Sequence, residues 1–212
     1  PLNVVLIPDY SNGGDMIITN KSITSFVGIK GKKVGCEVSS LGIFVLQRAL
    51  NKHGLSLNDV EIVNIEQSDG QQAMDKGQID AFVTYPPYSV NILKTKGRHT
   101  LFTSAEIPYQ VIDTVSFSTE TIKEHPDLIP KLQQAWQMAL DFTQQHPQQA
   151  YAIMAEREGV SAEEFAEALL DVKVLSIEQQ HKVFQDQVAL EASAAEVCKT
   201  LVHVNAIDID CS

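Results

Sequence analysis

The chain has 212 residues, of which 44% are hydrophobic and 20% are charged, and its formal net charge is −11 at pH 7. These values are ordinary for a globular protein and allow one large domain or two lobes. The negative charge argues against nucleic acid or an anionic membrane as a partner, although local donors can still hold a small anion. The sequence contains no apolar run of about 18 residues and no signal peptide pattern, so it predicts no membrane insertion.

Residues 1–116 alternate short apolar strands with helical segments. Strands are predicted near residues 3–7, 15–19, 33–37, 60–65, 79–84, 99–103 and 111–117, and helices near 22–28, 41–53, 69–76 and 87–96. This alternation predicts an α/β fold in which helices flank a parallel-type sheet. The helix at 41–53 has an apolar stripe, and Gly54 suits its C-terminal cap.

From about residue 118 the sequence becomes all-helical. A long helix carries Leu128, Leu132 and Trp136 on one face, and His146-Pro147 ends it. A second helix runs to about Arg157, a capping-box pattern opens another at residues 161–164, and a final helix lies near 192–203. The cysteines are Cys36, Cys198 and Cys211, and the last two could form a bridge that spacing alone leaves open.

The loop after the first predicted strand is the first candidate ligand-binding segment. Two glycines there allow close backbone approach, and polar side chains surround them. A plain surface turn explains the same residues, because Asn-Gly is a common turn signal. The candidate residues are Tyr10, Ser11, Asn12, Gly13, Gly14 and Asp15.

Two further groups of residues join this candidate site. Ser39 and Ser40 precede the helix at 41–53, where backbone N–H groups and hydroxyls can receive an anionic or carbonyl-like group; one serine could instead simply cap the helix. Tyrosines and carboxylates fall in the remaining segments, and none of the candidates is basic. They favour a neutral or cationic nitrogen-containing ligand, whereas packing and loop-orienting roles are the alternative. These candidates are Glu37, Tyr85, Tyr88 and Asp113, with Asp9 as a neighbouring carboxylate.

The sequence contains no recognisable catalytic or metal-binding pattern. Three of the six histidines are expected at helix ends, and the other three have no partner pattern nearby. The sequence also lacks a His-Glu-x-x-His motif, a Gly-x-Ser-x-Gly motif and a phosphate loop. No catalytic residue, cofactor or metal is therefore predicted. An enzyme remains the less favoured alternative, because distant residues can converge in a fold.

Several segments carry a family resemblance: Gly28–Gly35, Glu37–Gly42, Met74–Val83, Thr84–Tyr88, Phe102–Pro108 and Ile112–Val115. In this order and spacing, over about residues 3–175, they resemble the solute-binding proteins of nitrate/sulfonate/taurine-type ABC importers. Two features depart from that family. This chain has Tyr85-Pro86-Pro87 where an aromatic-Glu-Pro is common, and members normally carry several strand–helix units before the segment that starts here.

The resemblance implies a two-lobed periplasmic-binding-protein-like fold. Residues 10–110 would form a complete α/β lobe, and residues 1–9 and 111–212 would form hinge strands and the helical remainder of an incomplete first lobe. An oligomer partner or a complementing segment would then complete that lobe.

The function implied is that of a periplasmic or extracytoplasmic protein that binds a small-molecule ligand in a cleft between the lobes. Closure about hinges near residues 8–9 and 110–113 would present the loaded protein to an ABC permease with its ATPase. The competing reading is a ligand-binding sensory domain of a signalling protein.

Overall fold

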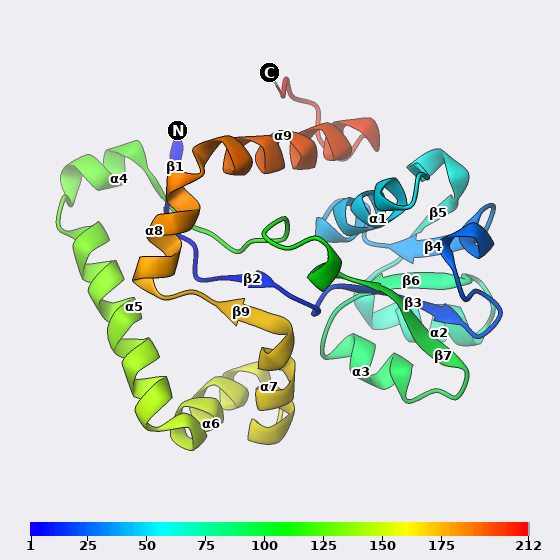
Figure 1. Cartoon of the computed structure of the whole chain (residues 1–212), viewed down its shortest axis with the longest axis horizontal. Helices are drawn as coiled ribbons and strands as arrows, with labels where there is room; N and C mark the ends of the chain where they lie inside the picture. Colours follow the sequence, from blue (N-terminus) through cyan, green and yellow to red (C-terminus); the bar gives the residue numbers. More distant parts are fainter. Residues whose placement is uncertain (212) are drawn as a thin grey trace. The chain divides into compact units, whose positions relative to one another are not determined.

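The computed structural model describes residues 1–211, which divide into two compact units (Figure 1). Unit 1 comprises Pro1–Ser11 and Ile112–Leu190, and unit 2 comprises Asn12–Val111 with the segment from Glu191 onward. Each unit has its own sheet pairing and its own buried cluster, so each is described by itself. The predicted α/β class, with a sheet, flanking helices and a helical C-terminal part, is confirmed.

Unit 2 is built on a five-stranded sheet with the order β5-β4-β6-β3-β7. β4 pairs in parallel with both β5 and β6, whereas β3 runs antiparallel between β6 and β7. The sheet is therefore parallel except for β3. Its strands are β3 (Met16–Asn20), β4 (Lys33–Cys36), β5 (Glu61–Asn64), β6 (Ala81–Thr84) and β7 (Arg98–Thr103).

Helices cover both faces of this sheet (Figure 1). Successive strand residues point to opposite faces, so Ile17 and Val83 join the cluster under α1, whereas Ile18 and Phe82 join the cluster under α2 and α3. The helical segments are α1 (Leu41–Lys52), α2 (Gln67–Asp75), α3 (Tyr88–Leu93) and the 3-10 helices η1 (Phe26–Ile29), η2 (Leu57–Asp59) and η3 (Ser104–Glu106).

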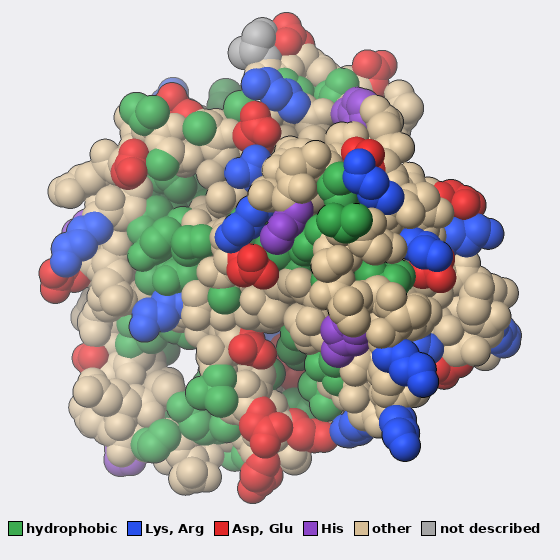
Figure 2. Space-filling view, turned by 45° about the vertical axis from the view of Figure 1, so that its right-hand side comes forward, with side chains coloured by type: hydrophobic (Ala, Val, Ile, Leu, Met, Phe, Trp, Pro, Cys, Tyr) green, Lys and Arg blue, Asp and Glu red, His purple; other side chains and the backbone are tan. Residues whose placement is uncertain are grey.

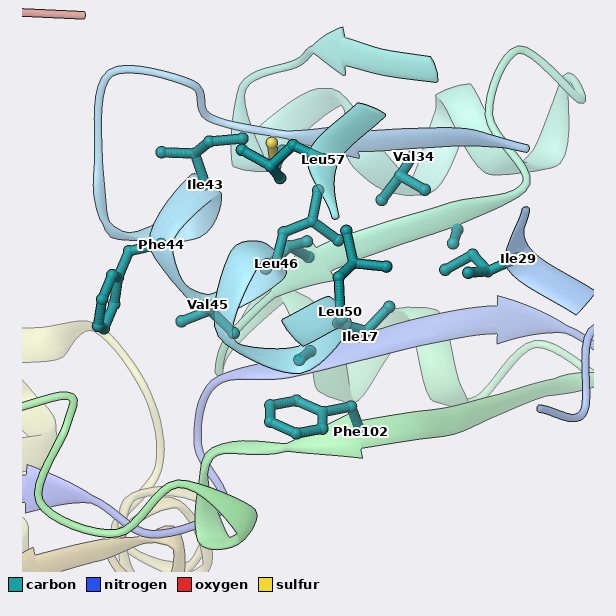
Figure 3. Close-up of a cluster of buried hydrophobic side chains, with 14 of the residues drawn as sticks. Ile17, Ile29, Val34, Ile43, Phe44, Val45, Leu46, Leu50, Leu57 and Phe102 are labelled. Atoms are coloured by element: carbon teal, nitrogen blue, oxygen red, sulfur yellow. The ribbon is translucent and has the colours of Figure 1, made fainter. Parts of the chain in front are cut away.

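The larger cluster of unit 2 lies between α1 and the sheet. Phe44, Val45, Leu46 and Leu50 of α1 are at most 1% exposed, and Leu46 and Leu50 point toward the strands, as Figure 3 shows. Leu41, at the start of the same helix, is 41% exposed. Burying each of these large apolar side chains contributes roughly 1.5–3 kcal/mol, so α1 is fixed mainly by packing.

The last long helix, α9 (Gln187–His203), begins in unit 1 and continues in unit 2. Its Val197 and Leu201 pack against the α1 cluster, and Glu196 forms an ion pair with Arg48 at 3.8 Å. This grouping differs from the sequence-based division, which assigned residues 191–212 to the other lobe, because the apolar face of α9 contacts α1. A disulfide joins Cys198 to Cys211 within the same unit.

Unit 1 contains two small antiparallel sheets and several helices. β1 pairs with β8, and β2 pairs with β9. The short strands β2 and β9 were not predicted; each has three residues, and they pair across about 160 positions of sequence. The elements are β1 (Leu2–Leu6), β2 (Asp9–Ser11), β8 (Val115–Ser118), α4 (Thr119–Glu124), α5 (Leu128–Gln145), α6 (Pro147–Glu158), α7 (Ala162–Ala168), η4 (Leu169–Asp171), β9 (Val172–Val174) and α8 (Ile177–Gln185).

One buried glutamine connects the segments at the centre of unit 1. Gln180 is 2% exposed; its Oε1 accepts a hydrogen bond from the Ile7 N–H at 3.1 Å, and its Nε2 donates to the Leu175 carbonyl. Trp136 Nε1 donates to that same carbonyl at 2.9 Å. The first strand, the β9–α8 connection and α5 are therefore held by side chains that satisfy buried backbone groups.

The helices of unit 1 leave much apolar surface uncovered. Within the described residues, α4, α5 and α7 contain no fully buried residue, and large apolar side chains such as Met138, Ile153 and Leu170 are 57–79% exposed. The predicted oligomer partner or complementing segment stays a prediction.

Figure 2 shows hydrophobic side chains between acidic and basic ones, and the charges of the two signs are interspersed over the visible face.

Some predicted boundaries shift. The helix expected at 22–28 is the 3-10 helix η1, and the helix expected at 87–96 is the shorter α3. The strand expected from residue 111 begins at Val115, because Ile112 makes only an isolated bridge to Tyr10. The capping box at Ser161 is confirmed, with hydrogen bonds in both directions between Ser161 and Glu164.

The packing of Gly70 in α2 generates a stability prediction. A Cβ at this position would overlap the ring of Phe82, whereas a Cβ on Gly42 in α1 would meet its nearest atoms at 3.4 Å. Alanine normally stabilises a helix interior by about 1 kcal/mol relative to glycine. Gly70→Ala should instead lower the free energy of unfolding by about 1–3 kcal/mol, because the core becomes overpacked. In urea unfolding the control Gly42→Ala should leave stability unchanged or raised; equal effects of the two substitutions would contradict the close approach.

Candidate functional site

The loops that carry most of the candidate residues meet at one edge of the five-stranded sheet. Met16 pairs with both Thr84 and Thr103, and Cys36 pairs with Asn64. Because β3 is antiparallel, its start lies beside the ends of the other four strands. We call this the carboxyl edge; the residues that flank the strands there are Asp15, Glu37, Ile65, Tyr85 and Ser104.

The loop at residues 12–15 is fixed to the segment that follows β7. The Gly13 N–H donates to Ser104 Oγ at 2.8 Å, and the Ser104 N–H donates to the Asp15 carbonyl at 2.8 Å. Gly13 has φ 134°, a conformation that favours glycine, and both Gly13 and Gly14 are buried. Asn12 is exposed. The glycines therefore let the backbone pass close to η3 and hold a defined loop at the carboxyl edge.

Glu37 organises the connection between β4 and α1. Its Oε1 accepts a hydrogen bond from the Gln67 N–H at 3.2 Å, and its Oε2 accepts one from the Ser40 hydroxyl at 3.1 Å. Gln67 is the first residue of α2, so the carboxylate lies at the positive end of that helix. Ser40 is the N-cap residue of α1, yet its hydroxyl makes no capping bond to the helix. The simple capping alternative for Ser40 is therefore not what the structure shows.

Tyr85 and Tyr88 form an aromatic pair between β6 and α3. Their ring centroids lie 5.9 Å apart at an interplanar angle of 86°, and the two side chains are 40% and 37% exposed. Partial burial raises the pKa of the Tyr85 hydroxyl, and the charges of Glu37, Tyr88, Asp15 and Glu66 raise it further. Carboxylates from three different loops thus act on one tyrosine at the carboxyl edge.

Ser39 is exposed in the connection between β4 and α1 of unit 2, and the remaining candidates belong to unit 1. Tyr10 is 8% exposed and packs with Ile7 and Leu175, so its ring contributes to the small core of that unit. Ser11 is also buried, whereas Asp113 is exposed. The Asp113 N–H donates to the Asp9 carbonyl at 3.1 Å. Burial and the neighbouring Asp113 carboxylate raise the pKa of Asp9 to about 6.

Several residues at the carboxyl edge were not among the predicted candidates. Asn64 Oδ1 accepts a hydrogen bond from the Val38 N–H, Gln67 Nε2 donates to the Val83 carbonyl, and Glu66 and Ser104 flank strand ends. Each lies within three residues of the end of a predicted strand. Their position beside predicted strand ends could have marked them as candidates. Polar residues are common at such positions, however, so the position alone does not distinguish a binding residue.

Two findings bear on other chemistries. Burial raises the pKa of the Cys36 thiol to about 12, and the charge of Glu37 adds to the shift, so the thiol stays protonated and is a poor nucleophile. Across the part of the chain that the structure describes, no group of three or more His, Cys, Asp or Glu residues is placed to hold a metal ion. In the same residues, no helix combines the length and apolar character that crossing a membrane requires.

Comparison with known protein families identifies the chain. The model of the family described as "NMT1/THI5 like" matches residues 5–150. The chain belongs to the NMT1/THI5-like family. This match confirms the resemblance to the nitrate/sulfonate/taurine type of solute-binding protein that the sequence segments predicted.

Similar proteins are known in sequence and in structure. A protein of Brucella abortus (strain 2308), named "Putative binding protein", is 26% identical over 144 residues, which are 66% of this chain but only 45% of that protein. The chain therefore spans about half the length of the curated relatives it matches. The periplasmic aliphatic sulphonate binding protein SsuA from Escherichia coli has a TM-score of 0.70 at 21% identity, over 89% of this chain and 66% of that one.

The fold itself does not separate binding from catalysis. The desulfurization enzyme DSZB has a TM-score of 0.68 at 14% identity, over 100% of this NMT1/THI5-like chain and 75% of the enzyme. A likeness at such low identity shows a shared fold. Function must therefore be argued from the residues of the site.

The carboxyl pair of unit 1 generates a prediction on pH. The folded state keeps a proton on Asp9 up to pH about 6, whereas the unfolded chain releases it near the ordinary aspartate pKa of 3.8. The folded state thus binds more protons between these values, so its stability falls as the pH rises through this window. Asp9→Asn should raise the free energy of unfolding at about pH 7.5 by on the order of 1 kcal/mol, and this gain should shrink towards about pH 4.

Urea unfolding at both pH values measures this effect. Asp171→Asn, which removes a half-buried carboxylate elsewhere in unit 1, is the matched control and should produce no such pH-dependent gain. A gain for Asp9→Asn of the same size at both pH values would show that the folded state does not raise the pKa of Asp9.

Proposed function

We propose that this protein is the solute-binding component of an ABC importer and that it captures a small organic molecule. The observation that carries the proposal is the gathering of polar and aromatic loops at one edge of the unit 2 sheet, in a chain of the NMT1/THI5-like family. In α/β sheets ligands bind outside the carboxyl ends of the strands. The protein offers fixed loops, an aromatic pair and hydrogen-bonding groups there, which suits recognition of a small solute.

Binding rather than catalysis is supported by the chemistry of the candidate residues. Glu37 already accepts two hydrogen bonds, and the buried Cys36 thiol is held in its protonated form. The carboxylates and tyrosines therefore act in our proposal as recognition groups, and an ABC permease with its ATPase is the proposed partner. Closure about the connections near residues 8–9 and 110–113 is proposed to accompany binding.

A location outside the cytoplasm belongs to the same proposal. The bond between Cys198 and Cys211 supports it, because disulfides persist in oxidising compartments such as the bacterial periplasm. SsuA of Escherichia coli is itself named a periplasmic protein. Both observations agree with a protein that binds its solute outside the cytoplasmic membrane.

Ligand capture is tested by native mass spectrometry of the purified chain and by a thermal-shift panel of alkyl sulfonates, taurine, nitrate, amines and pyrimidines. We expect either a co-purified small molecule or stabilisation by at least one solute. A solute at about 100 times its dissociation constant adds about 2.7 kcal/mol, which is a readable shift. If no molecule co-purifies and no solute of the panel stabilises the chain, the proposal is wrong.

A pair of glycine substitutions then locates the site. Gly13→Ala should weaken binding of that solute at least about tenfold, because alanine is strained at a positive φ and displaces the loop. Gly97→Ala imposes a similar strain at φ 88°, but Gly97 precedes β7 at the opposite edge of the sheet. Calorimetry should therefore find unchanged affinity for the control. Equal losses in both variants would contradict binding at the carboxyl edge.

A further inference from the structure

Negative charge at the carboxyl edge converges on Tyr85. Asp15, Glu37 and Glu66 reach this edge from β3, β4 and β5, and all three contribute to the raised pKa of the Tyr85 hydroxyl. An ionised carboxylate can accept about four hydrogen bonds, whereas the hydrogen bonds described above fill two of these positions on Glu37. The edge thus keeps acceptor capacity and a concentration of negative charge.

The aromatic pair of Tyr85 and Tyr88 also favours a positively charged ligand. Tyr85 and Tyr88 stand edge to face and remain more than a third exposed, so ring surface is accessible between β6 and α3. The face of a tyrosine ring is the negative end of its quadrupole and attracts cations. Two tyrosines and three carboxylates at one edge therefore favour positive charge more strongly than either set alone.

Two buried oxygens under this edge lack hydrogen-bond partners. Gln67 Oε1 and Thr84 Oγ1 have none, although the two residues are only 5% and 1% exposed. Gln67 makes hydrogen bonds through both its backbone and its side chain. Its N–H donates to Glu37, and its Nε2 donates to the carbonyl of Val83, which lies two residues before Tyr85. Its amide oxygen therefore lies between the Glu37 loop and the end of β6. An unpaired buried acceptor costs free energy, and a donor on a bound solute would satisfy it.

We propose that the solute bound at this edge is an organic cation whose nitrogen carries N–H donors, such as an ammonium or amidinium group. The charged nitrogen lies against the Tyr85–Tyr88 pair and faces the carboxylates of Asp15, Glu37 and Glu66. It donates hydrogen bonds to the Glu37 carboxylate and to Gln67 Oε1. This inference rests on the proposed function, since it names the class of solute that the same edge recognises.

Three probes of nearly one shape test the charge preference. Benzamidine is cationic, benzamide is neutral and benzoate is anionic, so their comparison isolates charge at constant ring size. By calorimetry with the full chain at neutral pH, benzamidine should bind at least about tenfold more tightly than benzamide, and benzoate should bind most weakly. Benzamide or benzoate binding as tightly as benzamidine, or no detectable binding of benzamidine, would overturn the inference.

Variants connect this preference to named residues. Glu37→Gln and Tyr85→Ala should each weaken benzamidine binding by about tenfold while changing benzamide binding much less. Glu61→Gln is the matched control, because Glu61 begins β5 at the opposite edge and pairs with Lys33 at 3.8 Å. Its benzamidine affinity should equal that of the unchanged protein. If Glu37→Gln unfolds the chain through its lost contact with α2, Tyr85→Ala with Tyr88→Ala gives the same test.

The panel of solutes separates the two proposals. A co-purified or stabilising sulfonate, together with no preference for benzamidine, would leave solute binding intact and overturn only the cation inference. Failure of every solute and every probe would overturn both. Preference for benzamidine that disappears in Tyr85→Ala and persists in Glu61→Gln would support both.

Discussion

The antiparallel insertion of β3 between β6 and β7 is the constraint on which the site depends. In this register Met16 is level with both Thr84 and Thr103. The segment before β3 is therefore brought to the edge where the parallel strands end, although it comes first along the chain. A shift of β3 by one residue would also move Ile17 and Ile18 to the wrong faces, so the two hydrophobic clusters that bury these residues fix the geometry of the edge.

The carboxyl edge combines groups that stabilise the fold with groups that are costly for it. The carboxylate of Glu37 interacts favourably with the N-terminal end of α2, where negative charge is stabilising. Neighbouring carboxylates and the two unpaired buried oxygens, in contrast, cost free energy unless a partner satisfies them. Groups that lower the stability of the fold are expected at sites where a protein binds a ligand. This balance is the physical basis for placing recognition at this edge.

Unit 1 depends on polar contacts more than on a large core. Its described buried cluster consists of Ile7, Tyr10 and Leu175 with partly buried neighbours, and Gln180 and Trp136 satisfy backbone groups around it. The carboxyl pair of Asp9 and Asp113 lies beside this cluster and is strained by repulsion at neutral pH. Such a unit has few apolar contacts per helix, and elements of this kind open at lower free energy than a packed core.

The sequence by itself determined the class of the fold, most of the strands and helices, and the family. Hydrophobic periodicity locates α1 and α5, and a capping box marks the start of α7, because these signals are local. It also placed most candidate residues in segments that flank strand ends. Tertiary structure alone decided that β3 is antiparallel, that β2 pairs with β9, that α9 packs on α1, and that Tyr10 is a core residue. These outcomes arise from pairing and burial between segments far apart in the chain, and no local pattern of residues records which distant partner a short strand or an apolar face will meet.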